Sequence, residues 1–234
     1  ATFQQAKEDG VTVLEIGEDV WGLKEFFHND IDELVESFTS AQREIAPEIE
    51  LRLQIGLSRH CPISYLEDCL SYFWGNKNFY SIDLYGDEFA QPIENFKGIY
   101  RRAKKEGLRL KAHVGEWGTA KDIRTAVEEL ELDEVQHGIA AAGDESVIRF
   151  LAENKIRLNI TPTSNVLLGR VADMAEHPIG KLYRSDIDGT INSDDVLIFD
   201  SDVSKEYLQL YEAQCLTAEE LENIRKNGLK PAML

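Results

Sequence analysis

The chain has little cysteine and no long apolar run. Among its 234 residues only three are cysteines, Cys61, Cys69 and Cys215, and no two of them form a C-x-x-C pair. This argues against a zinc site built from cysteine pairs, and it predicts reduced structural thiols rather than a disulfide framework. No apolar stretch approaches the ~20 residues that cross a bilayer. The sequence also shows no charged-then-apolar leader, so we expect a cytoplasmic protein that does not bind membranes.

Basic residues are scarce relative to acidic ones. The sequence contains 25 Lys and Arg against 43 Asp and Glu, which gives a formal net charge of −18. Such a surface repels a nucleic-acid backbone or an anionic membrane, so neither is an expected partner. The charge says little about a small neutral ligand. Hydrophobic residues make up 43% of the chain, enough for a sizeable core.

Short apolar runs rich in β-branched residues alternate with amphipathic stretches. The runs recur at roughly the length of a strand plus a crossover helix. Repeated βα units predict a parallel sheet with helices outside it, either doubly wound or closed into a barrel. We expect one domain over residues 1–234. The predicted strands are Val11–Ile16, Ile49–Gly56, Phe79–Leu84, Leu108–His113, Glu134–His137, Ile156–Ile160 and Thr190–Ser193.

Capping residues mark where several of the predicted helices begin. Asn29 or Asp30 can cap the helix that follows it, and Asp144 can cap another. Near the end of the chain, Thr217 and Glu220 have the spacing of a capping box. The helices therefore begin in the intervals between the predicted strands, as βα units require.

Reactive side chains follow the later strands. His113 and Glu116 follow one strand, His137 ends the next, and Asp194 and Asp195 follow the last. In a closed parallel barrel these residues would meet at one mouth, where they could bind a divalent metal and transfer protons. Each residue alone is weak evidence, because a single strand-end histidine is more commonly structural and an Asp-Asp pair is commonly a helix cap. We expect structural roles for the other histidines, His28, His60 and His177.

Several short segments are more specific in their order along the chain than any one of them alone. They are Arg59–Pro62, Ile82–Glu88, Lys111–Glu116, Gln136–Gly138, Thr161–Asn165 and Asn192–Asp195. Together they resemble the adenosine deaminase family of metal-dependent amidohydrolases, from about Phe3 to the end of the chain. The resemblance implies a (β/α)₈ TIM barrel and a purine substrate, neither of which the periodicity alone establishes.

By this resemblance, the site holds one divalent metal, expected to be zinc. His113 and Asp194 would be metal ligands, and Asp194 would also orient the attacking water. His137 would orient and deprotonate the metal-bound water. Zinc would lower the pKa of that water so that hydroxide forms near neutral pH.

The resemblance also implies contacts to the purine. Glu116 would be held protonated to donate to N1, which requires a raised carboxyl pKa. Asp195 would contact the N7 side, and the backbone of Gly86 would approach N3, which a residue without Cβ permits. The implied reaction is the hydrolysis of adenosine, or a related 6-aminopurine nucleoside, to inosine and ammonia.

One family feature is missing from the sequence. The family's first strand carries two metal-binding histidines as His-x-His, and this chain has none. Seven strands are predicted, so we expect a barrel without its first strand and two ends that look cut. Three explanations are open: a fragment, a natural truncation that binds no zinc, or a barrel completed by a homo-oligomer or a second chain. The H-x-E and P-C-x-x-C signature of other zinc deaminases is also absent, which argues against that fold.

Several functions remain open at this stage. The chain could be an active deaminase, a catalytically inactive nucleoside-binding homologue, or a relative acting on another aminopurine such as adenine or AMP. An amidohydrolase acting on a different ring is disfavoured, because the purine contacts expected of Glu116 and Asp195 would have no use there.

Overall fold

The computed structural model describes residues 1–229 and divides into two compact units. The first comprises residues 1–112 together with 129–131, and the second comprises residues 113–128 and the chain from 132 onward. Each unit is built of parallel strands and helices. The expectation of one domain over residues 1–234 stays a prediction, and its last five residues lie outside the described part.

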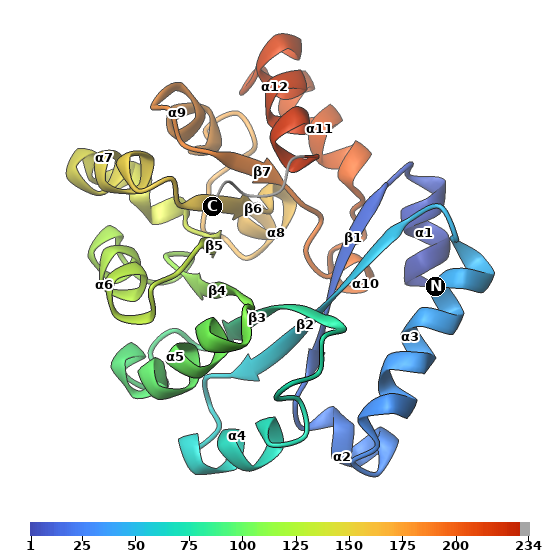
Figure 1. The fold of residues 1–234 in the computed structure, drawn as a ribbon. Helices are drawn as coiled ribbons and strands as arrows, with labels where there is room; N and C mark the ends of the chain where they lie inside the picture. Colours follow the sequence, from blue (N-terminus) through green and yellow to red (C-terminus); the bar gives the residue numbers. More distant parts are fainter. Residues whose placement is uncertain (230–234) are drawn as a thin grey trace. The chain divides into compact units, whose positions relative to one another are not determined.

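The first unit holds the strands β1 to β4, which pair in chain order and run parallel. The last two residues of β4 belong to the second unit. Figure 1 shows a helix after each of the first three strands. The elements are α1 (Thr2–Glu8), β1 (Val13–Asp19), α2 (Gly22–Phe27), α3 (Ile31–Ile45), β2 (Glu50–Ser58), α4 (Ile63–Leu70), β3 (Phe79–Tyr85), η1 (Ile93–Phe96), α5 (Lys97–Glu106) and β4 (Arg109–Val114).

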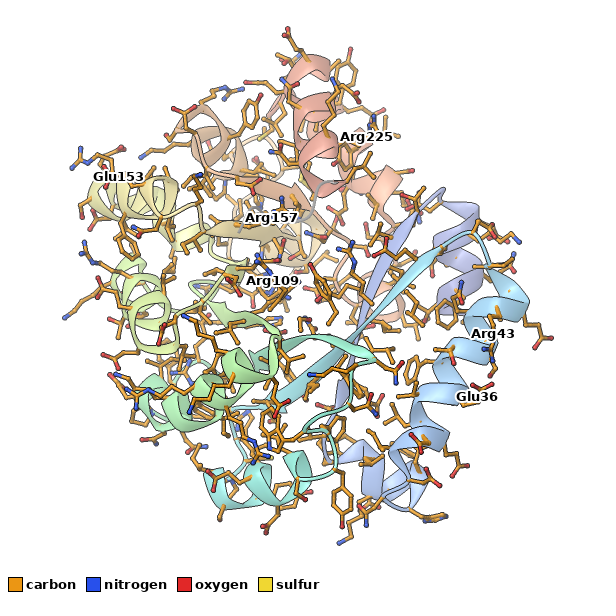
Figure 2. The ribbon with its side chains drawn as sticks, viewed as in Figure 1. Glu36, Arg43, Arg109, Glu153, Arg157 and Arg225 are labelled. Atoms are coloured by element: carbon orange, nitrogen blue, oxygen red, sulfur yellow. The ribbon has the colours of Figure 1, made fainter. Side chains whose placement is uncertain are left out.

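Helices α1 and α3 pack their apolar faces against the start of β1 and β2. Phe3 and Ala6 of α1 form a buried cluster with Ala46 and Ile49. Leu34 and Val35 of α3 are buried, and the carboxylate of Asp30, one of the two predicted caps, accepts hydrogen bonds from two backbone N–H groups. On the outer face of α3, Arg43 and Glu36 form an exposed ion pair (Figure 2). α3 therefore has a buried apolar face and an exposed charged face.

The first unit also has a buried polar cluster to which each of the strands β1 to β4 contributes one residue. Lys111 Nζ lies 2.7 Å from Glu15 Oε2, and the lysine side chain is only 5% exposed. The Glu15 carboxylate also accepts hydrogen bonds from Gln54 and Ser81. Buried charges require such partners, so these residues form a satisfied network within an otherwise apolar interior.

The second unit holds β5, β6 and β7, again parallel and in chain order. On β6, Arg157 (labelled in Figure 2) pairs with Asp188 at 3.0 Å. The elements are α6 (Ala120–Leu130), β5 (Glu134–His137), η2 (Ile139–Gly143), α7 (Glu145–Glu153), β6 (Arg157–Ile160), α8 (Pro162–Leu167), α9 (Ile179–Arg184), β7 (Gly189–Ile191), α10 (Val196–Phe199), α11 (Val203–Glu212) and α12 (Ala218–Gly228).

All seven predicted strands are present, with small changes at their ends. β1 begins two residues later than predicted and continues to Asp19. The predicted strand ended too early because the last residues of β1 are polar and do not extend the apolar run. β7 ends at Ile191, before the predicted Ser193. Asp144 caps α7, and Thr217 and Glu220 form the predicted capping box of α12. The α/β class with parallel strands and intervening helices is therefore confirmed, and it agrees with a barrel that lacks its first strand.

Within residues 1–229, no helix combines the length and the apolar character needed to cross a bilayer.

Candidate active site

Glu116 is placed by a tight turn after β4. Gly115 has a positive φ of +76°, and its carbonyl accepts a hydrogen bond from Ala140 N at 2.9 Å. A Cβ at Gly115 would lie 2.4 Å from two side-chain carbons of Ile123 on α6. Only glycine fits here without movement. The turn thus determines the position of Glu116, which lies three residues after His113 in the sequence.

His137 ends β5 in a conformation unusual for a residue with a side chain. Its φ is +62°, and Gly138 after it is also left-handed at +66°. The side chain is buried, and its ring centroid lies 5.1 Å from that of His113. Strained backbone of this kind costs free energy and is concentrated at functional sites. The structure therefore brings the two predicted imidazoles together.

The turn from β6 into α8 supplies polar partners for His137 and Glu116. Thr161 Oγ1 lies 2.9 Å from His137 Nδ1. Asn165 Nδ2 lies 3.1 Å from Glu116 Oε1 and 3.2 Å from His137 Nδ1. His137 Nδ1 and Glu116 Oε1 are themselves 3.6 Å apart. We refer to Glu116, His137 and Asn165 as the acid–imidazole cluster.

The surroundings of Glu116 favour its protonated form. Burial raises the pKa of its carboxyl above the ordinary value, and the negative charge of Asp194 raises it further. His113 and hydrogen bonds from Asn165 and Trp117 act in the opposite direction without cancelling the effect. The direction agrees with the predicted role of Glu116 as a carboxylic acid that retains its proton near neutral pH.

Asp194 and Asp195 lie in the turn after β7. Asp194 is left-handed, with φ +59°, and its carboxylate accepts a hydrogen bond of 2.8 Å from Asp195 N. Both residues are exposed. For Asp194 the role as a metal ligand stays a prediction. For Asp195 the contact to N7 stays a prediction.

Gly86 is a residue of the first unit and follows β3. Its φ is +95°, and a Cβ there would lie 3.2 Å from His60 Cδ2. A side chain at this position would therefore be strained as well as crowded. The predicted contact from its backbone to purine N3 stays a prediction.

Two buried residues near the cluster were not predicted to serve it. His177, expected to be structural, accepts a hydrogen bond from Ile179 N and contacts Asn165 Oδ1. Glu206 on α11 is fully buried, and its carboxylate accepts hydrogen bonds from Thr163 N and the Ser201 hydroxyl. The one sequence signal for Glu206 was its place on the same helix face as Leu210, where an apolar residue is expected.

A cavity of about 270 Å³ borders Glu116 within the second unit. It is open to solvent on one side, and its wall combines apolar side chains with three charged ones, Glu116, Arg170 and Glu176. Arg170 donates to the backbone carbonyl of Glu116 at 3.0 Å and stacks on Trp117, 4.4 Å from its ring centroid. The lining residues are Glu116, Ile139, Ala140, Arg170, Val171, Ala172, Glu176 and Pro178.

The described residues do not complete a zinc site by themselves. In the part of the chain that the structure describes, no group of three His, Cys, Asp or Glu side chains could hold a metal ion. Only two predicted ligands, His113 and Asp194, are present in the sequence. A catalytic zinc needs three protein ligands and one open position. These residues would require further donors to hold the metal.

The chain is similar in sequence to known purine deaminases. The profile of the family described as adenosine deaminase matches residues 3–234. The adenine deaminase of Rhodopseudomonas palustris is 30% identical over 239 residues, which cover 100% of this chain and 69% of that protein. The adenosine deaminase of Serratia proteamaculans is 35% identical over 154 residues, which cover 66% of this chain and 46% of that enzyme.

Solved structures support the same assignment. The crystal structure of an adenine deaminase from Arthrobacter aurescens matches with a TM-score of 0.85 and 25% identity, covering 97% of this chain and 70% of the other. An amidohydrolase from Burkholderia ambifaria with bound Zn has the same TM-score at 22% identity, covering 97% of this chain and 65% of the other, and it supports the fold alone. Since the family profile spans nearly all 234 residues, this chain belongs to the adenosine deaminase family of hydrolytic deaminases.

Proposed function

We propose that the chain supplies the purine-binding and proton-transfer groups for hydrolytic deamination of a 6-aminopurine. In this reaction the C6–N bond is replaced by a C6–O bond from water, and ammonia leaves. The observation that carries the proposal is the acid–imidazole cluster, in which a buried carboxyl with a raised pKa lies 3.6 Å from a buried imidazole beside a cavity. Pairs of titratable groups in such surroundings are typical of acid–base catalysis.

Glu116 would hold the proton that the ring nitrogen N1 receives. Protonation at N1 withdraws electrons from C6, so that C6 can accept an oxygen and become tetrahedral. His137 would orient the attacking water, and Asp195 would contact N7. These roles come from the family resemblance, and the buried geometry of Glu116 and His137 supports the first two.

The attacking water would require activation by zinc. His113 and Asp194 would hold it as two of its ligands, so activity would depend on donors beyond them. A second function, purine binding without turnover, is favoured by this incomplete set. Measuring bound zinc per chain separates the two, since a stoichiometric metal is expected only for the enzyme.

Ammonia release tests the proposed reaction. Adenosine, adenine and AMP should be offered separately to the protein in the presence of zinc. We expect release from at least one of the three. No release from any of them, with one zinc bound per chain, would overturn the proposal. The relative rates would also identify the preferred aminopurine.

A further inference from the structure

His177 is tied to the acid–imidazole cluster by a chain of hydrogen bonds with a fixed direction. Its Nδ1 lies 3.2 Å from the backbone nitrogen of Ile179. A backbone N–H can only donate, so Nδ1 must be the acceptor and carries no hydrogen. Burial lowers the pKa of His177 to about 4, so the ring is neutral at physiological pH. Its single N–H therefore sits on Nε2.

This tautomer determines the orientation of the Asn165 amide. Nε2 of His177 faces Asn165 at 3.3 Å and must donate to it. The oxygen of the amide, rather than its nitrogen, must then face His177. Because the two ends of the amide point in opposite directions, the NH₂ group must face the other way, toward the acid–imidazole cluster.

The NH₂ group has two hydrogens and two neighbouring acceptors. It lies 3.1 Å from Glu116 Oε1 and 3.2 Å from His137 Nδ1. A hydrogen bond to Oε1 makes that oxygen the carbonyl-like acceptor of the acid, so its proton is favoured on Oε2. A hydrogen bond to His137 Nδ1 excludes a hydrogen there, and the Thr161 hydroxyl, 2.9 Å from the same nitrogen, must then donate to it as well. The neutral ring of His137 therefore carries its N–H on Nε2.

We propose that His177 is a positioning residue that, through Asn165, determines which atoms of Glu116 and His137 carry protons. The consequence for catalysis rests on the proposed function, whereas the proton positions do not. Any hydrogen bond from Nε2 of neutral His137 to the attacking water would be donated. His137 would thus orient the water rather than remove its proton through that nitrogen.

Two substitutions separate the two hydrogen bonds of His177. His177→Gln places an amide NH₂ near the position of Nε2 and can still donate to Asn165. His177→Asn places an acceptor near the position of Nδ1 for Ile179 N, but it is too short to reach Asn165. If His177 served only to fill space, both variants would behave alike.

The test is a long-range ¹H–¹⁵N spectrum of the imidazoles in ¹⁵N-histidine-labelled protein, without substrate, at pH 8. In the unsubstituted protein we expect the Nε2–H form for both His177 and His137. His177→Gln should keep this form at His137, and His177→Asn should yield a mixture of tautomers. An Nδ1–H form of His177 in the unsubstituted protein would overturn the proposal whether or not the variants fold. So would a His137 tautomer that does not change in a folded His177→Asn protein.

Ammonia release adds a second measurement. His177→Gln should retain the rate within about threefold, whereas His177→Asn should lower kcat at least tenfold with little change in KM. Equal rates in both variants would contradict the catalytic part of the proposal. Since the spectra need no turnover, they would still decide the proton positions if the protein proves inactive.

Discussion

Nδ1 of His137 lies 3.6 Å from Oε1 of Glu116, and one amide nitrogen, that of Asn165, is within hydrogen-bond distance of both. The acid and the imidazole therefore share a neutral donor. Their protonation states depend on each other and on that donor.

Glu116→Gln should retain the fold and lose the reaction. A glutamine can still accept from Asn165 through its carbonyl oxygen, but it has no carboxyl proton to transfer. Loss of a general acid costs typically 10²- to 10⁴-fold, so kcat for ammonia release should fall by about that factor with little change in KM. Glu176→Gln, in the wall of the same cavity, is the matched control and should stay within threefold. A Glu116→Gln rate within threefold of the unsubstituted protein would contradict the assigned role.

Glu18, near the end of β1, should make stability depend on pH. Burial and the charge of Asp19 raise the pKa of its carboxyl from 4.5 to about 7 in the folded state. Between these values the folded protein retains a proton that the unfolded chain has lost. Stability therefore falls as pH rises through this window, and above it the full cost of ionisation remains.

Glu18→Gln removes this titration and should stabilise the protein only above pH 4.5. The gain in the free energy of unfolding should grow up to about pH 7. Because the side chain is partly exposed, we expect only about 1–2 kcal/mol at the plateau. Urea unfolding at a series of pH values measures the gain. A difference between the two proteins that is constant with pH would exclude this explanation.

Lys111→Met should destabilise the first unit strongly. It leaves the Glu15 carboxylate without the ammonium group that lies 2.7 Å away. Removing one partner of a buried ion pair costs about 3–5 kcal/mol. The double variant Lys111→Met with Glu15→Gln removes both charges and should recover part of that loss. Urea unfolding of the parent, the single variants Lys111→Met and Glu15→Gln, and the double variant completes the cycle. A Lys111→Met protein as stable as the parent would refute the buried pair.

Gly115→Ala should damage both stability and activity. The alanine would have to adopt a left-handed backbone, and its methyl carbon would lie 2.4 Å from side-chain carbons of Ile123. We expect a loss of roughly 2–4 kcal/mol in the free energy of unfolding and a displaced Glu116. Gly75→Ala is the matched control, because Gly75 is also left-handed but has no atom within 4 Å of the position that a methyl group would take. Its loss should be only about 1 kcal/mol. Equal losses in the two variants would show that packing against Ile123 is unimportant.

The fold was largely accessible from the sequence, whereas the network around the site was not. Apolar runs predicted every strand and capping residues predicted where several helices begin, because both signals are local in the sequence. The role of His177 depends on Asn165, twelve residues earlier, and on the direction of one backbone N–H group. Glu206 meets Thr163 across 43 residues. Contacts of this kind are set by tertiary packing, and no periodicity in the sequence encodes them.

The most direct test of the central claim is whether Glu116 hydrogen-bonds to purine N1. Adenosine labelled with ¹⁵N at N1 can be bound to chelator-treated protein, so that it is not consumed, and its N1 resonance can be followed by NMR. The account predicts an upfield shift on saturating binding to the unsubstituted protein and to Glu176→Ala, and no such shift with Glu116→Ala. An N1 resonance that stays at its free position in the unsubstituted protein at saturation, or that shifts equally with Glu116→Ala, would contradict it.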